Sequence, residues 1–168
     1  TETITANANL KKWAFNASVY HSKNPMGFSL VYDENRNISK FTTLNFEKEI
    51  GASLGLDVPF EYKFLTSQNS LSVNYSKTED SLAVVHPLTP YLYFYTNNTA
   101  KLGKGFNFLL DGYWVTKRTQ GLYEYNEMLI VNLGLTKSIS NFDFTLRYND
   151  VFRQNNFVQK LTYDKIIT

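Results

Sequence analysis

Few side chains of this sequence are spaced for catalysis or for metal binding. The two histidines, His21 and His86, have no second histidine or carboxylate at the spacing of a metal site. Serines are frequent, yet none stands in a Gly-x-Ser-x-Gly turn and no Ser/His/Asp set can be assembled. Cysteine is absent, which excludes disulfides and thiol chemistry. We therefore expect no catalytic residue, no metal site and no cofactor.

Five polar residues stand where apolar and polar positions alternate, and they are the candidates for a functional polar lining: Asp57, Asp111, Asp143, Arg147 and Asn149. Alternate residues of a strand point to opposite faces of a sheet, so these side chains share the polar face. Asp143 and Arg147 are four residues apart, too far for an ion pair along one strand, which favours partners on neighbouring strands.

The segment 141–149 shows the pattern most clearly. Phe142, Phe144, Leu146 and Tyr148 alternate with Asp143, Thr145, Arg147 and Asn149. Similar alternation recurs along the chain with large aromatics on the apolar side. This pattern is typical of a sheet with lipid on one face and a polar lumen on the other.

The composition supports the same prediction. Aromatic residues make up 16% of the chain, whereas charged residues make up 19%, below the roughly 25% usual for soluble domains. Mean hydropathy is −0.32, and no apolar run approaches the roughly 20 residues of a transmembrane helix. The formal net charge of +2 gives no sign of a nucleic-acid partner.

The pattern predicts seven or eight strands and no helix. The expected strands span 12–20, 28–32, 41–60, 70–76, 91–99, 106–114, 129–136 and 141–149, and 157–167 starts a further strand or an ordered loop. Short turns are expected at 66–69, 102–105 and 138–141, and at Gln120–Gly121. Longer or more polar segments are expected near 35, 80 and 155, at the opposite ends of the strands.

The predicted fold is an all-β, antiparallel, up-and-down transmembrane β-barrel in which residues 1–168 form a single domain. Eight aromatic residues are expected to face lipid or to form girdles at the membrane interfaces. They are Trp13, Phe15, Phe106, Phe108, Trp114, Phe142, Phe144 and Tyr148. The five polar candidates would then line the lumen, either shaping permeation or contacting a plug, or forming a mutually paired structural lining. Arg147 is placed inward because a basic side chain facing lipid would cost roughly 2–4 kcal/mol.

Four segments resemble the C-terminal barrel of TonB-dependent receptors, with the closest likeness to the outer-membrane barrel family of Bacteroidetes. They span 105–114, 120–125, 129–137 and 144–152, and the likeness is strongest at Gly121, Lys137 and Asp150-Val151-Phe152. The resemblance implies the outer membrane of a Gram-negative bacterium and a role in ligand uptake or in scaffolding an outer-membrane complex. It also implies the lipid bilayer, a plug domain, a TonB-like energising protein and a surface lipoprotein as partners.

The sequence departs from that family in three places. Ser53 stands where members often carry glutamate, and neither a closing aromatic strand nor a plug domain is recognised within 1–168. Seven or eight strands would be about a third of a 22-stranded transporter barrel. We therefore expect a partial barrel that belongs to a larger one.

Two alternatives remain open at this point. The length also suits a stand-alone eight-stranded outer-membrane barrel with a structural or adhesive role. A soluble, lipocalin-like calyx would instead turn its apolar face inward around a ligand. The direction in which Trp13, Phe106, Leu133 and Phe144 point distinguishes the calyx from the membrane barrel.

A cluster of aromatic residues gives a last candidate site, for carbohydrate stacking. Its members are Tyr91, Tyr93, Tyr95, Trp114, Tyr123 and Tyr125. The alternative interpretation makes several of them rim-girdle residues, with the ring in the interface and the hydroxyl in water.

Overall fold

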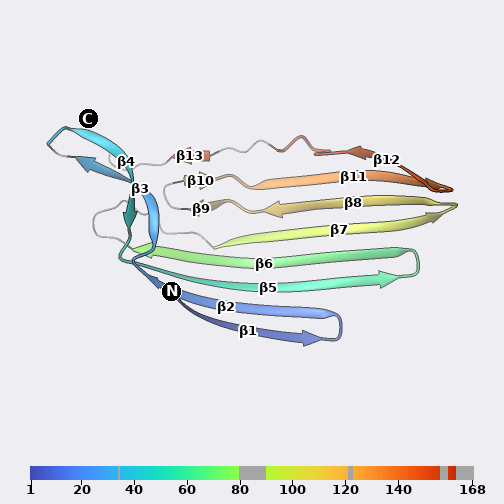
Figure 1. Ribbon diagram of the computed structural model, residues 1–168, viewed down its shortest axis with the longest axis horizontal. Helices are drawn as coiled ribbons and strands as arrows, with labels where there is room; N and C mark the ends of the chain where they lie inside the picture. The colour runs from blue at the N-terminus through green and yellow to red at the C-terminus, as the bar shows by residue number, and fades with distance from the viewer. Residues whose placement is uncertain (34, 80–89, 121–122, 156–158, 162–168) are drawn as a thin grey trace.

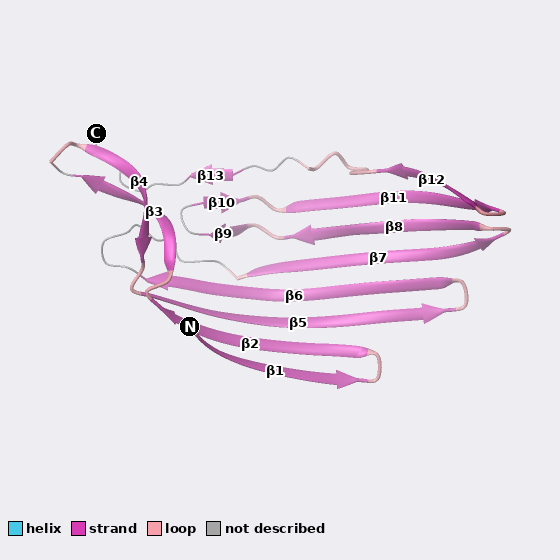
Figure 2. Cartoon of the chain, viewed as in Figure 1, coloured by secondary structure: helices cyan, strands magenta, loops and turns pink. Residues whose placement is uncertain are grey.

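The computed structural model describes residues 1–33, 35–79, 90–120, 123–155 and 159–161, and these residues fold as one large antiparallel sheet with two small ones beside it. The large sheet has eight strands in the order β1-β2-β5-β6-β7-β8-β11-β12, which run side by side across Figure 1. The described residues contain no helix, as the cartoon in Figure 2 shows, and hence none that could cross a membrane.

The strands of the large sheet follow one another in chain order and pair antiparallel throughout. Their bounds are β1 Glu2–Leu10, β2 Trp13–Lys23, β5 Lys48–Tyr62, β6 Leu65–Glu79, β7 Tyr91–Gly103, β8 Phe106–Val115, β11 Met128–Ile139 and β12 Phe142–Tyr148. This meander confirms the predicted all-β, up-and-down fold, and the sheet is not closed.

Four short turns lie along one edge of the large sheet, which we call the short-turn rim. They join β1 to β2, β5 to β6, β7 to β8 and β11 to β12, at the right of Figure 1. Each turn contains a non-glycine residue at positive φ, namely Lys11, Lys63, Lys104 and Ser140. The turns predicted at 102–105 and 138–141 are confirmed.

The opposite edge, the loop rim, carries two smaller sheets. The hairpin of β3 (Met26–Asp33) and β4 (Ile38–Asn45) stands between β2 and β5 in the chain. A second small sheet combines β9 (Arg118–Gln120), β10 (Tyr123–Tyr125) and β13 (Gln159–Leu161). The connection at Gln120–Gly121 is therefore part of an extension beyond β8 and β11, and residue 121 itself lies outside the described residues.

Phe46 fixes the base of the β3–β4 hairpin. Its backbone N–H donates to the carbonyl of Pro25 at 2.9 Å, and its ring is buried. A Cβ atom at Gly27 would overlap that ring, so glycine is needed there for close packing. The hairpin thus has its own small apolar contact, separate from the large sheet.

The register divides the large sheet into an apolar face and a polar face. On β6, Leu71, Val73 and Tyr75 point to the apolar face, whereas Ser72 and Asn74 point to the polar face. The apolar side chains are exposed and the polar ones are partly covered, as expected for a sheet that curls around its polar face. In the described residues, the buried hydrophobic set consists of Phe46, Val115 and Ile130 alone.

Three features of the strand prediction are wrong. The first strand, β1, was not predicted at all. The segment 41–60 is two strands, β4 and β5, separated at Phe46 and Glu47. The turn expected at 66–69 lies inside β6, and the chain turns instead at Lys63 and Phe64.

Candidate functional site: the two faces of the sheet

The apolar face exposes many large side chains. All eight predicted lipid-facing or girdle residues lie on it by register, from Trp13 and Phe15 on β2 to Phe142, Phe144 and Tyr148 on β12. Leu54 is 61% exposed and Phe144 is 59% exposed. An apolar surface of this extent is found at membrane or protein interfaces rather than in water.

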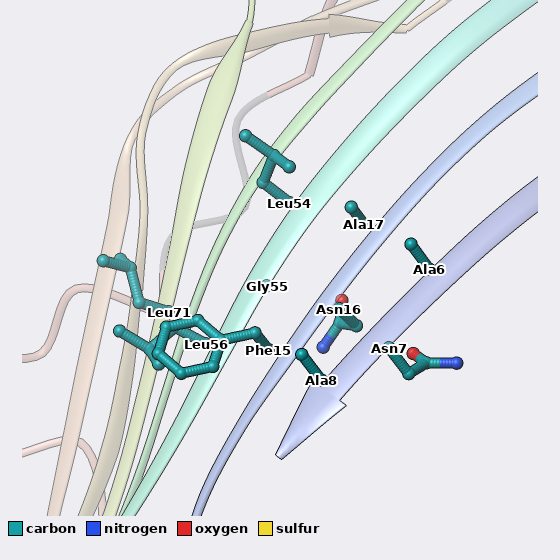
Figure 3. A pocket seen from close by; sticks show the side chains of 10 residues that line it. All are labelled: Ala6, Asn7, Ala8, Phe15, Asn16, Ala17, Leu54, Gly55, Leu56 and Leu71. Atoms are coloured by element: carbon teal, nitrogen blue, oxygen red, sulfur yellow. The ribbon is translucent and has the colours of Figure 1, made fainter. Parts of the chain in front are cut away.

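A shallow apolar groove of about 450 Å³ crosses this face over β1, β2 and β5. Small side chains form its floor, and larger ones flank it, as Figure 3 shows for Ala6, Ala8 and Ala17 beside Phe15 and Leu54. The groove is open along the surface and presents almost no polar group, so its chemistry suits a hydrocarbon chain.

A small polar cluster interrupts the apolar face near the short-turn rim. Asn69 donates to Ser67 Oγ at 2.8 Å and accepts from Thr96 Oγ1 at 2.8 Å. Ser67 donates to Asn98 Oδ1 at 2.6 Å, and Asn98 donates to Thr96. Ser67 is only 6% exposed. Each member is hydrogen-bonded, which limits the cost of placing these groups on an apolar surface.

The polar face carries a network that joins three strands. Arg147 on β12 donates to Asp111 Oδ1 on β8 at 2.5 Å. Asn132 on β11, between them, donates to the other oxygen of Asp111 at 2.7 Å. Gly134 lies opposite Arg147 in the register and offers no side chain that would stand between Arg147 and Asp111.

The structure thus brings together two of the five polar candidates and separates the others. Asp57 accepts from Ser70 Oγ at 2.5 Å, and Asp143 accepts from Ser138 Oγ at 2.6 Å near the short-turn rim. Asn149 follows β12 and is exposed. Asn132 was missed in the sequence because an asparagine at one polar position of a strand carries no distinctive signal.

The segment Asp150-Val151-Phe152 forms the turn that ends the β12 pairing. The Asp150 backbone N–H donates to Asn132 Oδ1 at 2.9 Å. The Asp150 carboxylate in turn accepts from the backbone N–H groups of Gln154 and Asn155 at 3.0 and 2.9 Å. Asn132 therefore links this turn to the polar network.

The aromatic cluster considered for carbohydrate stacking is divided between the faces. Tyr93 and Tyr95 lie on the polar face, where Tyr93 stacks on Tyr113 with ring centroids 6.0 Å apart. Trp114 lies on the apolar face. The Cζ atom of Arg118 lies 5.9 Å from the centroid of the Tyr91 ring and 4.7 Å from the centroid of the Tyr125 ring. The side chain of Tyr123 lies outside the described residues. The described members of this set therefore do not lie on one face of the sheet.

Tyr20 and Gly51 form a close contact on the polar face. The two residues are directly opposed on β2 and β5, and a Cβ atom at Gly51 would overlap the tyrosine ring. The Tyr20 hydroxyl donates to Glu49 Oε1 at 2.5 Å. The glycine therefore lets the ring lie flat across the neighbouring strand.

Ion pairs on the loop rim tie the ends of β5 and β6 together. Glu79 lies 2.7 Å from Lys48 Nζ and 2.7 Å from Lys77 Nζ. Hydrogen bonds from these two ammonium groups lower the pKa of Glu79 to about 2. Within the described ranges, no group of three His, Cys, Asp or Glu side chains is placed to hold a metal ion, and His86 lies outside those ranges.

An open antiparallel meander with an exposed apolar face and a polar face defines the wall of an outer-membrane β-barrel. Residues 2–168 match the Outer membrane protein beta-barrel family, and the chain belongs to this family. Its location is accordingly the outer membrane of a Gram-negative bacterium, with the apolar face against the lipid bilayer. No curated protein and no solved structure matches this chain.

Proposed function

We propose that this chain is part of the barrel wall of a larger, TonB-dependent-receptor-like protein that takes up a ligand or scaffolds an outer-membrane complex. The observation that supports this proposal is the open sheet. Within the described residues, β1 pairs only with β2, and β12 pairs only with β11. An unpaired strand edge is not stable in hydrocarbon, so further strands on both edges would complete the wall.

The resemblance of 105–114, 120–125, 129–137 and 144–152 to Bacteroidetes receptors supplies the finer part of this proposal. A plug domain would contact the polar face, a TonB-like protein would supply energy from the periplasm, and a surface lipoprotein would cover the loop rim. The proposal gives the chain no catalytic step.

A stand-alone eight-stranded barrel with a structural or adhesive role is the second candidate. The count of eight strands in the large sheet favours it, since eight is the smallest number found in outer-membrane barrels. It requires β1 and β12 to pair with each other. The calyx alternative is opposed by the exposure of Trp13 and Phe144 and by the family of the chain.

The intact mass of the natural protein separates the two barrel candidates. Outer membranes would be extracted with detergent, and the protein would be detected with an antibody raised against this segment. A mass several times 19.4 kDa is the expected result and supports the receptor-sized barrel. A mass near 19.4 kDa would replace it with the small closed barrel.

A further inference from the structure

The short-turn rim carries a band of lysines. Among the described residues, six lysines lie in the four turns or within three positions of them: Lys11, Lys12, Lys63, Lys101, Lys104 and Lys137. Two carboxylates, Glu61 and Asp143, lie in the same region. Because successive turns stand side by side along one edge (Figure 1), these charges form one band.

The two carboxylates of the rim already have partners, which leaves most of the positive charge uncompensated. Glu61 pairs with Lys12 at 2.9 Å, and Asp143 accepts from Ser138. Within the described ranges, no ion pair joins Lys11, Lys63 or Lys104 to a carboxylate. All three are exposed, and each occupies the positive-φ position of its turn.

Among the residues that the structure describes, the loop rim has no comparable excess of positive charge. The cations there whose side chains are described are Lys23, Arg36, Lys40, Lys48, Lys77, Lys117, Arg118 and Arg153, and the carboxylates are Glu2, Asp33, Glu47, Glu49, Glu79, Glu124, Glu127 and Asp150. Several of these residues form ion pairs with one another. The two rims are therefore electrostatically different.

Aromatic side chains of the apolar face stand directly beside the rim lysines. The Nζ atom of Lys137 lies 4.1 Å from the centroid of the Phe106 ring and donates to the carbonyl of Lys104. The Nζ atom of Lys63 lies 5.2 Å from the centroid of the Tyr62 ring. A basic group above an aromatic ring at a strand end is the arrangement that anchors a protein at the headgroup level of a bilayer.

We propose that the short-turn rim binds the phosphate headgroups of anionic phospholipids in the periplasmic leaflet of the outer membrane. This inference rests on the placement of the chain in that membrane. The short turns of outer-membrane barrels face the periplasm, so the lysine band meets phospholipid headgroups there. A band of ammonium groups attracts anionic lipids over zwitterionic ones, and salt screens the attraction.

The two tryptophans of the chain report on the two rims separately. Trp13 follows the turn between β1 and β2, whereas Trp114 stands near the loop-rim end of β8, and both lie on the apolar face. The full protein would be reconstituted into phosphatidylcholine vesicles that contain brominated phosphatidylglycerol or brominated phosphatidylcholine as the quencher. The difference in quenching between the parent protein and W13F gives the quenching of Trp13. The difference between the parent protein and W114F gives the quenching of Trp114.

We expect brominated phosphatidylglycerol to quench Trp13 about fivefold more than brominated phosphatidylcholine does, because one lysine near an anionic surface contributes a factor of about five. This ratio should fall in 0.5 M salt, which screens the attraction. The same quenching ratio measured for Trp114 should be about one. K11Q/K63Q/K104Q should reduce the Trp13 preference toward one, while K23Q/K40Q/R153Q, which removes the same charge from the loop rim, should leave it unchanged.

Three results would overturn the inference, and the third is distinguishable from the first two. Equal quenching of Trp13 by both lipids, or a preference that survives K11Q/K63Q/K104Q, would remove headgroup binding while leaving the membrane barrel intact. Absence of quenching of both tryptophans by both lipids would show that the apolar face does not meet lipid, and would remove the barrel placement as well.

Discussion

At the scale of single residues, Asn132 holds the polar face together more than the charged pair beside it does. The Asp111–Arg147 pair is half exposed, and exposed ion pairs contribute about 0–1 kcal/mol. Asn132 instead serves two partners on two different elements, Asp111 and the backbone of Asp150. Its loss leaves a partly buried donor and acceptor without partners.

This difference predicts an order of stability among variants. R147Q should lower the free energy of unfolding by at most about 1 kcal/mol, whereas N132A should lower it by about 1–3 kcal/mol. Thermal unfolding in detergent micelles, followed by heat-dependent migration on gels, measures both. T145A, which removes one exposed hydroxyl pair on the same strands, is the matched control. A larger loss in R147Q than in N132A would contradict the argument.

Glu79 gives a pH dependence at the loop rim. Lys48 and Lys77 hold the pKa of Glu79 near 2 in the folded protein, below the ordinary value for glutamate of about 4.3. A depressed folded pKa adds stability that is fully present above pH 4.3 and is lost as the pH falls toward 2. E79Q should therefore differ from the parent above pH 4.3 and converge with it near pH 2. Parallel curves in unfolding experiments between pH 2 and pH 7 would refute this.

At the scale of elements, the polar cluster on β6 and β7 explains why the turn predicted at 66–69 is wrong. Thr66-Ser67-Gln68-Asn69 has the composition of a turn, but Ser67 and Asn69 are bonded within a continuous strand. Hydrogen bonds across strands cannot be read from composition. The turn forms instead at Lys63, a residue with no special turn preference.

Other elements show what alternation can and cannot predict. The aromatic strands β8 and β12 were placed correctly because large apolar residues mark one face. β1 was missed because Ala6 and Ala8 occupy its apolar positions, and alanine has little strand preference. The break between β4 and β5 was missed because the alternation continues across Phe46, whose burial depends on contacts with β3.

The polar cluster on β6 and β7 also yields a prediction about stability. N69L removes the donor to Ser67 and the acceptor for Thr96 and leaves both hydroxyls on an apolar face with one partner fewer. We expect a loss of about 1–3 kcal/mol in unfolding free energy, measured in lipid vesicles. V73L, a substitution on the same face and strand away from the cluster, is the control. An unchanged or raised stability of N69L would show that the cluster is dispensable.

At the scale of the whole molecule, the two edges of the sheet decide between a closed eight-stranded barrel and part of a larger barrel. In the described part of the chain, β1 and β12 each have one neighbour and lie at opposite ends of an eight-stranded sheet. Their polar faces carry residues such as Thr5 and Thr145. A closed eight-stranded barrel would bring these two strands together in an antiparallel pair.

Cysteine cross-linking tests whether the two edges meet. The chain has no native cysteine, so engineered pairs are unambiguous. T5C combined with T145C or with R147C should give no disulfide within one chain if additional strands complete the barrel. T136C/T145C, at residues directly opposed on β11 and β12, should oxidise and serves as the positive control. Efficient oxidation of either T5C pair would establish the stand-alone barrel.

In the part of the chain that the structure describes, the outer edges of β1 and β12 are unpaired, and this determines the order of events in biogenesis. Each edge presents a row of N–H and C=O groups that hydrocarbon cannot solvate, and an exposed edge readily templates aggregation. The sheet can therefore cross the bilayer only in step with the pairing of its edges. Until those edges are paired, the apolar face and both edges have to be shielded from water and from other chains.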